Sequence, residues 1–214
     1  KQHGLSRLAG QREGAINAHR IVEILFDCGI KYVTLYVFST ENWNRPKEEV
    51  DMIFQILTGI IDGEVKFAQK RGIRVCHLGK LDGLPLRLRN KIKHAVELTK
   101  GNKAMTVSLA LNYGGRDEII GAVRHLVSDG ISAGSVDEAL FRRYLYTAGM
   151  PDPDLVIRTG GELRLSNFLL WQVAYAEFYS TPVLWPDFDR DEIEKTFVAY
   201  KERQRRFGSV APAD

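Results

Sequence analysis

Tyr32-Val33-Thr34-Leu35-Tyr36-Val37-Phe38 is the stretch that decides the fold. It is β-branched and aromatic, which is typical of a buried strand. A polar loop over residues 39–46 follows, and Pro46 then occupies a first-turn position of a long helix. Apolar residues recur along that helix with helical spacing, and Gly72 is expected to end it. A strand that runs through a polar loop into a helix is the repeating unit of an α/β fold.

The alternation of strands and helices continues on both sides of this stretch. Further helices are predicted over residues 16–28, 86–99, 117–127 and 136–145, and from Asp189 to near Phe207. Further strands are predicted over residues 73–78, 105–111 and 154–157, while residues 173–179 fit either a helix or a strand. Strands separated by helices imply right-handed crossovers and a mostly parallel sheet. We expect a single α/β domain over residues 1–214.

The composition is that of a globular protein. Hydrophobic residues make up 44% of the 214 residues and charged residues 27%, a balance that excludes a disordered chain. Lys and Arg number 30 against 27 Asp and Glu. Because so small a surplus cannot form a generally basic face, it argues against a nucleic-acid partner but permits a local anion site.

The sequence also carries expectations about the protein's compartment. No apolar run approaches the ~20 residues that span a bilayer, and no signal peptide is recognisable. Cys28 and Cys76 lie inside apolar patterns, so we expect buried thiols and not a disulfide. A cytoplasmic protein in a reducing compartment is predicted.

Loops that carry arginine follow three of the predicted strands. They cover residues 39–46, 112–116 and 158–167, and two of them contain a Gly-Gly pair. The carboxyl ends of parallel strands meet at one edge of a sheet, where ligands bind. Glycine lets backbone N–H groups approach a phosphate, and arginine offers a planar two-pronged donor. Any one loop could be a turn with a solvated or ion-paired arginine, but three arginines at one edge repel unless an anion joins them.

Other phosphate and metal motifs are absent from the sequence. There is no G-x-x-x-x-G-K-[ST], no G-x-G-x-x-G, no Asp-Asp-x-x-Asp, no G-x-S-x-G and no zinc-ligand spacing among the histidines. Residues 187–191 begin like a calcium loop, but Glu192 stands where glycine is required. Asp189 is therefore expected to cap the last helix.

Five segments closely resemble motifs of the cis-prenyltransferase family, the undecaprenyl diphosphate synthase-like proteins. They are residues 38–46, 112–116, 154–162, 164–172 and 184–188, in order along nearly the whole chain. The resemblance implies a mostly parallel sheet of about six strands flanked by helices, an elongated apolar tunnel, a homodimer and magnesium. It also implies condensation of isopentenyl diphosphate onto an allylic diphosphate of the farnesyl or geranylgeranyl type. The product would be a medium- or long-chain polyprenyl diphosphate with new cis double bonds.

The resemblance implies substrate-binding and catalytic residues by motif. Ser39 and Asn42 look like the polar pair near the reacting carbons, and Trp43 like a residue that shapes their pocket. Arg7 and Arg45 resemble clamps on the allylic diphosphate. Ligands of isopentenyl diphosphate would be Arg158, Arg164 and Ser166.

Metal binding and subunit contact are implied in the same way. Glu177 resembles a magnesium ligand, and Arg206 and Gly208 match an Arg-x-Gly that reaches the neighbouring subunit's site. The family's Asp-Gly-Asn motif, with the central magnesium ligand, is expected just before Lys1, so no catalytic aspartate is named. Gln11 and Leu163 stand where relatives have histidine, which removes imidazole chemistry from those positions.

Two alternatives remain open at this point. One is a non-catalytic subunit of a two-protein prenyltransferase, which would supply only a scaffold and the Arg-x-Gly tail. The other is an unrelated α/β module that binds phosphate.

For the enzyme, loose contact with a membrane surface is expected, because the product is apolar.

Overall fold

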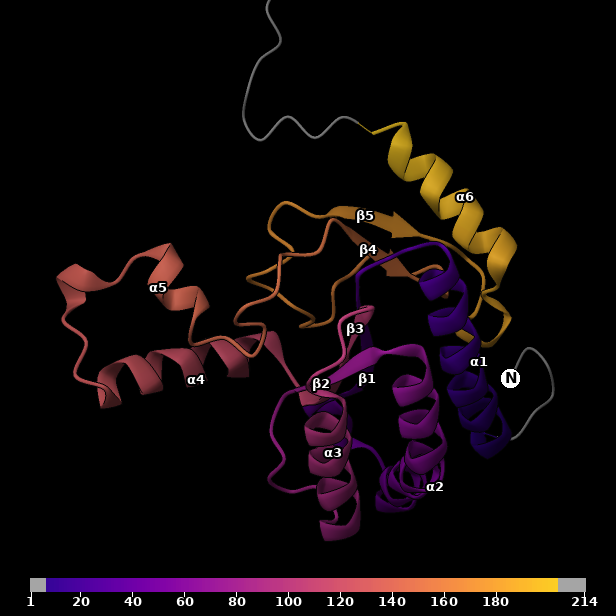
Figure 1. The fold of residues 1–214 in the computed structure, drawn as a ribbon, viewed down its shortest axis with the longest axis horizontal. Coiled ribbons are helices and arrows are strands. Elements are labelled where there is room, and N and C mark those ends of the chain that lie inside the picture. Colours follow the sequence, from indigo (N-terminus) through magenta and orange to yellow (C-terminus); the bar gives the residue numbers. More distant parts are fainter. Residues whose placement is uncertain (1–6, 204–214) are drawn as a thin grey trace, which may run out of the picture.

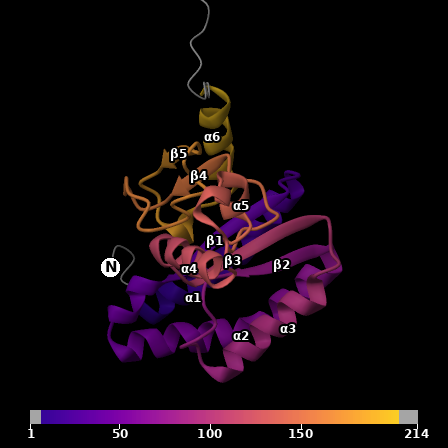
Figure 2. The same ribbon diagram turned by 90° about the vertical axis from the view of Figure 1, so that its left-hand side faces the viewer.

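The computed structural model describes the backbone of residues 7–203 and the side chains of residues 9–203, and this part contains five parallel strands. Strands β1 (Tyr32–Ser39), β3 (Met105–Tyr113) and β2 (Ile73–Leu78) form one sheet in that order. A second sheet pairs β4 (Leu155–Arg158) with β5 (Glu177–Ser180). Figure 2 shows β1, β3 and β2 side by side. Residues 173–179, left open by the sequence, thus contribute the start of a strand.

The expectation of about six strands in one sheet is wrong for the described residues, which form sheets of three and two strands. The sixth strand came only from the resemblance, whose additional motif is expected ahead of Lys1. Side-chain packing joins the two sheets instead. Ala110 and Tyr113 of β3 share a core cluster with Val156 of β4 and with Leu169. The two sheets therefore belong to one packed α/β body.

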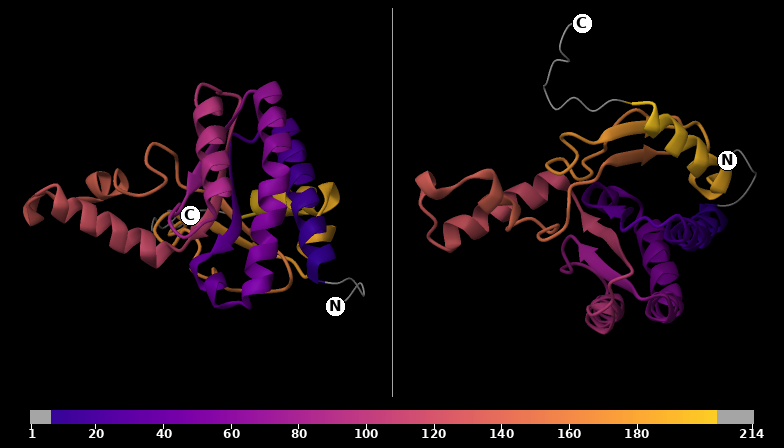
Figure 3. Two further views of the ribbon diagram at one scale, coloured as in Figure 1. Left: turned by 90° about the horizontal axis from the view of Figure 1, so that it is seen from below. Right: turned by 45° about the horizontal axis from the view of Figure 1, so that its top comes forward.

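In the view of Figure 1, α2 (Lys47–Arg71) and α3 (Leu86–Thr99) lie below the larger sheet, and α1 (Arg7–Asp27) stands to its right. Helix α2 lies between α1 and α3 and contacts both of them, as the view from below in Figure 3 shows. Gly72 ends α2 in the left-handed region, with φ 67°, as predicted. The chain after α1 turns at Gly29 in the same way, with φ 77°.

The remaining helices are α4 (Gly115–Ser128), α5 (Glu138–Arg142) and α6 (Arg190–Lys201). Helices α4 and α5 form an arm that stands apart from the sheets, whereas α6 packs on β5 (Figure 1). Three short 3-10 helices complete the fold: η1 (Thr40–Asn44), η2 (Ala133–Ser135) and η3 (Trp185–Asp187). Asp189 caps α6 by accepting from the N–H of Glu192, as predicted.

Two predicted helices are shorter in the structure. The helix expected over residues 136–145 is reduced to α5, because Arg143, Tyr144 and Leu145 bond to the carbonyl three residues back, which tightens the chain into turns. The last helix ends at Lys201, before the predicted end near Phe207, and Phe207 itself lies outside the described residues.

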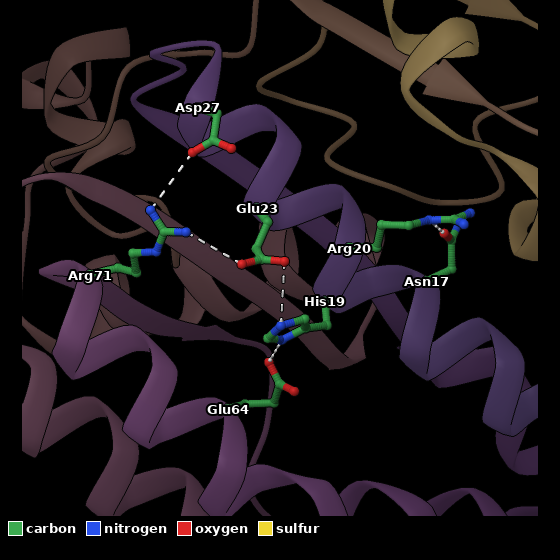
Figure 4. A network of polar contacts seen from close by, with 7 residues as sticks. All are labelled: Asn17, His19, Arg20, Glu23, Asp27, Glu64 and Arg71. Carbon is green, nitrogen blue, oxygen red and sulfur yellow. Dashed lines mark hydrogen bonds and ion pairs between the residues drawn. The ribbon is translucent and has the colours of Figure 1, made fainter.

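Charged side chains tie α1 to α2 (Figure 4). The Nδ1 atom of His19 lies 2.9 Å from Oε2 of Glu64. Arg71 approaches Glu23 at 3.4 Å and Asp27 at 3.7 Å. All of these side chains are more than a third exposed, so each pair contributes at most about 1 kcal/mol. The network sets how the two helices meet more than it stabilises them.

Asn17, also drawn in Figure 4, fixes α1 to the chain around η3. This side chain is 2% exposed. Its amide donates to the carbonyl of Phe188 at 2.9 Å and to that of Trp185, and its oxygen accepts from Nε of Arg20 at 2.8 Å. An asparagine is thus fully paired where the last part of the chain meets the first helix.

The exposure of the two cysteines and the character of the helices bear on two expectations from the sequence. Cys76 is buried as expected, but Cys28 is exposed, so its predicted burial is wrong. Cys28 follows the last residue of α1 and lies in an exposed turn with Gly29. Within residues 7–203, none of the helices has the length and apolar character required to cross a membrane.

Candidate active site

A large cavity lies among the helices and strands, with a volume of about 1330 Å³. Apolar side chains of α1, α2, β1 and β4 line much of it. Helix α2 contributes Ile53, Leu57 and Ile60, so its apolar stripe forms part of the lining. Asn42 and the three arginines Arg45, Arg158 and Arg164 also line the cavity. The end of β4 and the loops after β1 and β4 thus bring arginines to a largely apolar space, in line with the strand-end argument. The expectation is wrong for the third loop, because Arg116 is exposed and does not line the cavity.

The three arginines differ in their partners. Arg45 pairs with Glu49 at 2.9 Å, and Arg164 pairs with Glu162 at 2.5 Å. Arg158 has no ion pair within the described part of the chain, and its buried Nε has no hydrogen-bond partner there. A buried donor without a partner is costly, so Arg158 is the side chain best prepared to receive an anion.

Tyr36 lies beside this arginine. Its hydroxyl is 3.3 Å from the carbonyl oxygens of Tyr113 and Ser166, and its ring stacks on Phe168 with centroids 4.6 Å apart. Burial and then the nearby Glu41 carboxylate raise the pKa of Tyr36 to about 12. The phenol is therefore protonated at neutral pH and acts as a donor.

The turn η1 carries the predicted polar pair. The backbone N–H of Ser39 donates to Oδ1 of Asn42 at 3.1 Å, which fixes the orientation of the Asn42 amide. The Trp43 ring packs against Phe38 and Phe54, with centroids 5.4 and 5.3 Å apart. Of these residues Asn42 lines the cavity, whereas Ser39 and Trp43 are not among its lining residues.

The glycine pairs have a different role from the predicted one. The N–H of Gly115 donates to the carbonyl of Asn167 at 2.7 Å. The N–H groups of Gly160 and Gly161 donate to carbonyls of residues 183 and 181, both at 2.8 Å. A Cβ on Gly114 would lie 2.5 Å from Oγ1 of Thr40. The glycines therefore permit close packing of loops, and these three N–H groups are not free to bind phosphate.

A buried polar cluster that the sequence did not reveal lies behind the arginine loops. Glu118 is 2% exposed and accepts hydrogen bonds from the hydroxyl of Tyr113 at 2.5 Å and from the N–H of Tyr146 at 2.8 Å. The amide of Gln172 donates to Glu118 at 3.1 Å and to Thr147 at 3.0 Å. Burial, reinforced by the Glu118 charge, raises the pKa of Tyr113, so this phenol stays a donor. The cluster joins β3, α4 and the segment after Asn167.

Glu177, the expected magnesium ligand, lies away from Arg158. It pairs in register with Leu155 at the start of β4, whereas Arg158 ends that strand. Three residues of strand separate the two positions, which is about 10 Å. The Glu177 carboxylate accepts from Nη1 of Arg203 at 2.9 Å. The described residues contain no group of three or more His, Cys, Asp or Glu placed to hold a metal, so they do not by themselves form a complete magnesium site.

The other expected site residues fall into two groups. The Arg7 side chain, Arg206 and Gly208 lie outside the described residues, and their roles stay predictions. Gln11 lines the cavity, and its buried Oε1 has no partner in the described region. Leu163 is 81% exposed. Neither residue brings a titratable group to the cavity. Ser166 has φ 51° and does not line the cavity, but its carbonyl faces Tyr36.

The arrangement of loops and strands is shared with known proteins. A family model described as putative undecaprenyl diphosphate synthase matches residues 1–208. An isoprenyl transferase of Fusobacterium nucleatum is 47% identical over 98% of this chain and 90% of its own length. One from Thermotoga maritima is 45% identical over 98% of this chain and 91% of its own length.

The chain is also similar to solved structures of prenyl diphosphate synthases. The chain superposes with a TM-score of 0.92 on lavandulyl diphosphate synthase from Lavandula x intermedia in complex with dimethylallyl diphosphate, at 37% identity over 97% of this chain and 92% of that one. A probable undecaprenyl diphosphate synthase from Campylobacter jejuni gives 0.82 at 35% identity over 92% of both chains. The extent of these matches, together with the arginine-lined cavity, shows that the chain belongs to the undecaprenyl diphosphate synthase family of isoprenyl transferases.

Proposed function

We propose that the protein is a cis-prenyltransferase that condenses isopentenyl diphosphate onto a farnesyl- or geranylgeranyl-type diphosphate. The product is a medium- or long-chain polyprenyl diphosphate. The observation that carries this proposal is the convergence of Arg45, Arg158 and Arg164 on one largely apolar cavity, with Arg158 lacking a partner in the described chain. The likeness to a structure that holds dimethylallyl diphosphate supports an allylic diphosphate as one substrate.

The chain's own residues have separable tasks in this reaction. Arg158 and Arg164 hold one diphosphate and Arg45 the other, because guanidinium groups match phosphate oxygens bidentately. Fixed cations stabilise the negative charge that develops on the leaving diphosphate. Asn42, oriented by Ser39, faces the cavity beside these groups and assists removal of the proton after the new bond forms. The apolar lining receives the growing chain, at about 0.8 kcal/mol for each buried CH₂ group. We propose that this lining is the expected tunnel.

Magnesium is proposed as the cofactor, with Glu177 as one protein ligand. Magnesium in proteins commonly takes one or two carboxylates and completes its coordination with water and substrate phosphates. A bound ion would neutralise charge on the leaving diphosphate. Glu177 supplies one carboxylate, and its contact with Arg203 must be exchanged when the ion binds.

The experiment that tests the function uses full-length protein and labelled isopentenyl diphosphate. Dimethylallyl, geranyl, farnesyl and geranylgeranyl diphosphates are offered separately with magnesium, and products are sized by mass spectrometry. We expect label in chains longer than the starter, made best from the farnesyl or geranylgeranyl compound. Failure of every starter to accept label contradicts the proposal and favours the scaffold subunit. A single addition to dimethylallyl diphosphate alone favours a short-chain synthase.

Glu177→Gln is expected to raise the magnesium concentration required for half-maximal activity, because one anionic ligand is lost. A titration of activity with magnesium chloride measures the change. The control is Glu202→Gln, since Glu202 is exposed at the end of α6 and has no expected metal role. An unchanged titration for Glu177→Gln would remove this residue from the metal site.

We further propose a homodimer that uses the exposed face of α4. Ile120, Val123 and Val127 are 51%, 47% and 73% exposed and follow one another at helical spacing on an arm that stands away from the sheets (Figure 3). A contiguous apolar stripe on an exposed helix marks an interaction surface.

We also propose a cytoplasmic enzyme in loose contact with a membrane surface that takes up its apolar product.

Val127→Glu is expected to shift the protein from dimer toward monomer, because a carboxylate would be buried in an apolar contact. Sedimentation equilibrium measures the molar mass. Val198→Glu on α6 is the matched control, since Val198 is similarly exposed at 57% but lies off the arm. A dimer of unchanged affinity would exclude α4 from the interface.

A further inference from the structure

Two asparagines adopt the left-handed backbone conformation on either side of the turn η1. Asn112 has φ 54° and Asn167 has φ 64°. At Asn112 the register between β1 and β3 slips, since Phe38 pairs with Leu111 but Ser39 pairs with Tyr113. Such a bulge redirects one side chain out of the regular pleat. Asparagine tolerates this conformation better than most residues, so both positions favour it.

The redirected side chain of Asn112 joins three loops. Its Oδ1 accepts from the indole Nε1–H of Trp43 at 2.8 Å. Its Nδ2 donates to the carbonyls of Lys80 at 3.1 Å and Asp82 at 2.9 Å. Asn112 is 6% exposed. The oxygen and the nitrogen of the amide thus both have partners, which sets one orientation of the amide, and that orientation holds the Trp43 indole.

Asn167 holds the same turn from the other side. Its Nδ2 donates to Oε1 of Glu41 at 2.6 Å, and its Oδ1 accepts from the N–H of Arg116 at 2.9 Å. Partial burial disfavours ionisation of Glu41, but hydrogen bonds from its own backbone, Asn167, Ser39 and Thr40 outweigh this and lower the pKa of the carboxyl. Glu41 is therefore an anionic acceptor at neutral pH.

Asn42 lies between the two residues that are held. Trp43 follows it and Glu41 precedes it, and each is bonded to an asparagine from a distant part of the chain. We propose that Asn112 and Asn167 are positioning residues that fix Asn42 at the cavity for the reaction. The proposal rests on the proposed prenyl transfer. Displacement of a reacting group by about 1 Å can cost on the order of 100-fold in rate, so such anchors matter for turnover.

The main variant is Asn112→Gly, which keeps the left-handed backbone available but removes the amide. We expect kcat to fall roughly 10- to 100-fold, while KM for isopentenyl diphosphate changes little, because Arg158 and Arg164 are untouched. Trp43→Phe removes the indole donor and also reduces the ring that packs on Phe38 and Phe54. The loss in the double variant should be smaller than the sum of the two single losses, because both changes break the same hydrogen bond.

A matched control separates positioning from stability. The Asn102 amide also bridges two elements, donating to Gln69 at 2.9 Å and to the Ile73 carbonyl at 2.8 Å, but it does not line the cavity or touch η1. Asn102→Gly should lower the melting temperature and leave kcat unchanged. Equal kcat for wild type and Asn112→Gly, with only the melting temperature lowered, would overturn the proposal.

A second measurement does not depend on activity. The chain has three tryptophans, so ¹⁵N spectra of the protein contain three indole N–H signals, and the one missing in Trp43→Phe belongs to Trp43. We expect this signal to move in Asn112→Gly and to stay in place in Asn102→Gly. An unmoved signal contradicts the contact on which the proposal depends. If wild type transfers no label to any starter, the proposed function fails, whereas the indole shift still reports on the anchor.

Discussion

Glu118→Ala is expected to lower the free energy of unfolding by roughly 2–6 kcal/mol. The change leaves the Tyr113 hydroxyl and the Tyr146 N–H buried without an acceptor, at about 1–3 kcal/mol each. Gln172 keeps one partner, Thr147. Because whole domains are stable by only about 5–15 kcal/mol, this loss is a large fraction of the total. Urea titration followed by circular dichroism measures it.

The neighbouring acid provides the control. Asp117 precedes Glu118 in the first turn of α4, but its side chain is 34% exposed and pairs with Lys80 at the surface. Asp117→Ala should cost no more than about 1 kcal/mol. Equal destabilisation by the two substitutions would show that the buried cluster does not stabilise the fold in the way its hydrogen bonds indicate.

The fold was predictable where one strong local signal acted. Strand β2 and helix α3 have the predicted bounds. β-Branched residues mark the strand, and the helix begins directly after Pro85 and ends at Thr99. The shorter α5 and the division of the sheet were not predictable. Both depend on contacts between distant segments, and strand pairing is a property of the whole chain.

The sequence predicted the arginines of the site better than the residues that hold or accompany them. Arg45 and Arg158 were expected to meet because each stands at the carboxyl end of a predicted parallel strand. They do line one cavity, although β1 and β4 belong to two packed sheets and not to one. The place of Glu177 could not be predicted, because residues 173–179 fitted either a helix or a strand. Glu177 lies away from Arg158 because it is the first residue of β5 and pairs with Leu155, whereas Arg158 is the last residue of β4. Asn112 carried a usable signal, an asparagine just before Tyr-Gly-Gly at the end of a strand, but the bulge that aims it at Trp43 depends on register.

Arg158→Ala is expected to raise KM for isopentenyl diphosphate about 10- to 150-fold. This corresponds to about 1.5–3 kcal/mol for a charge-assisted contact with phosphate. KM for the allylic diphosphate should change less, because Arg45 lies in another loop. The free protein should be as stable as wild type or more so, since the change removes a buried donor that has no partner in the described chain. Initial rates with each substrate varied in turn, together with a melting curve, measure both effects.

Arg116→Ala is the matched control, because Arg116 also stands next to a Gly-Gly pair near a strand end but is exposed and does not line the cavity. Its kinetics should equal those of wild type. If the Arg158 variant keeps its KM for isopentenyl diphosphate, or the Arg116 variant loses activity equally, the unpartnered guanidinium is not the diphosphate ligand. Weaker substrate binding with undiminished stability would show that the partly buried Arg158, whose Nε has no partner in the described chain, serves its ligand and not the fold.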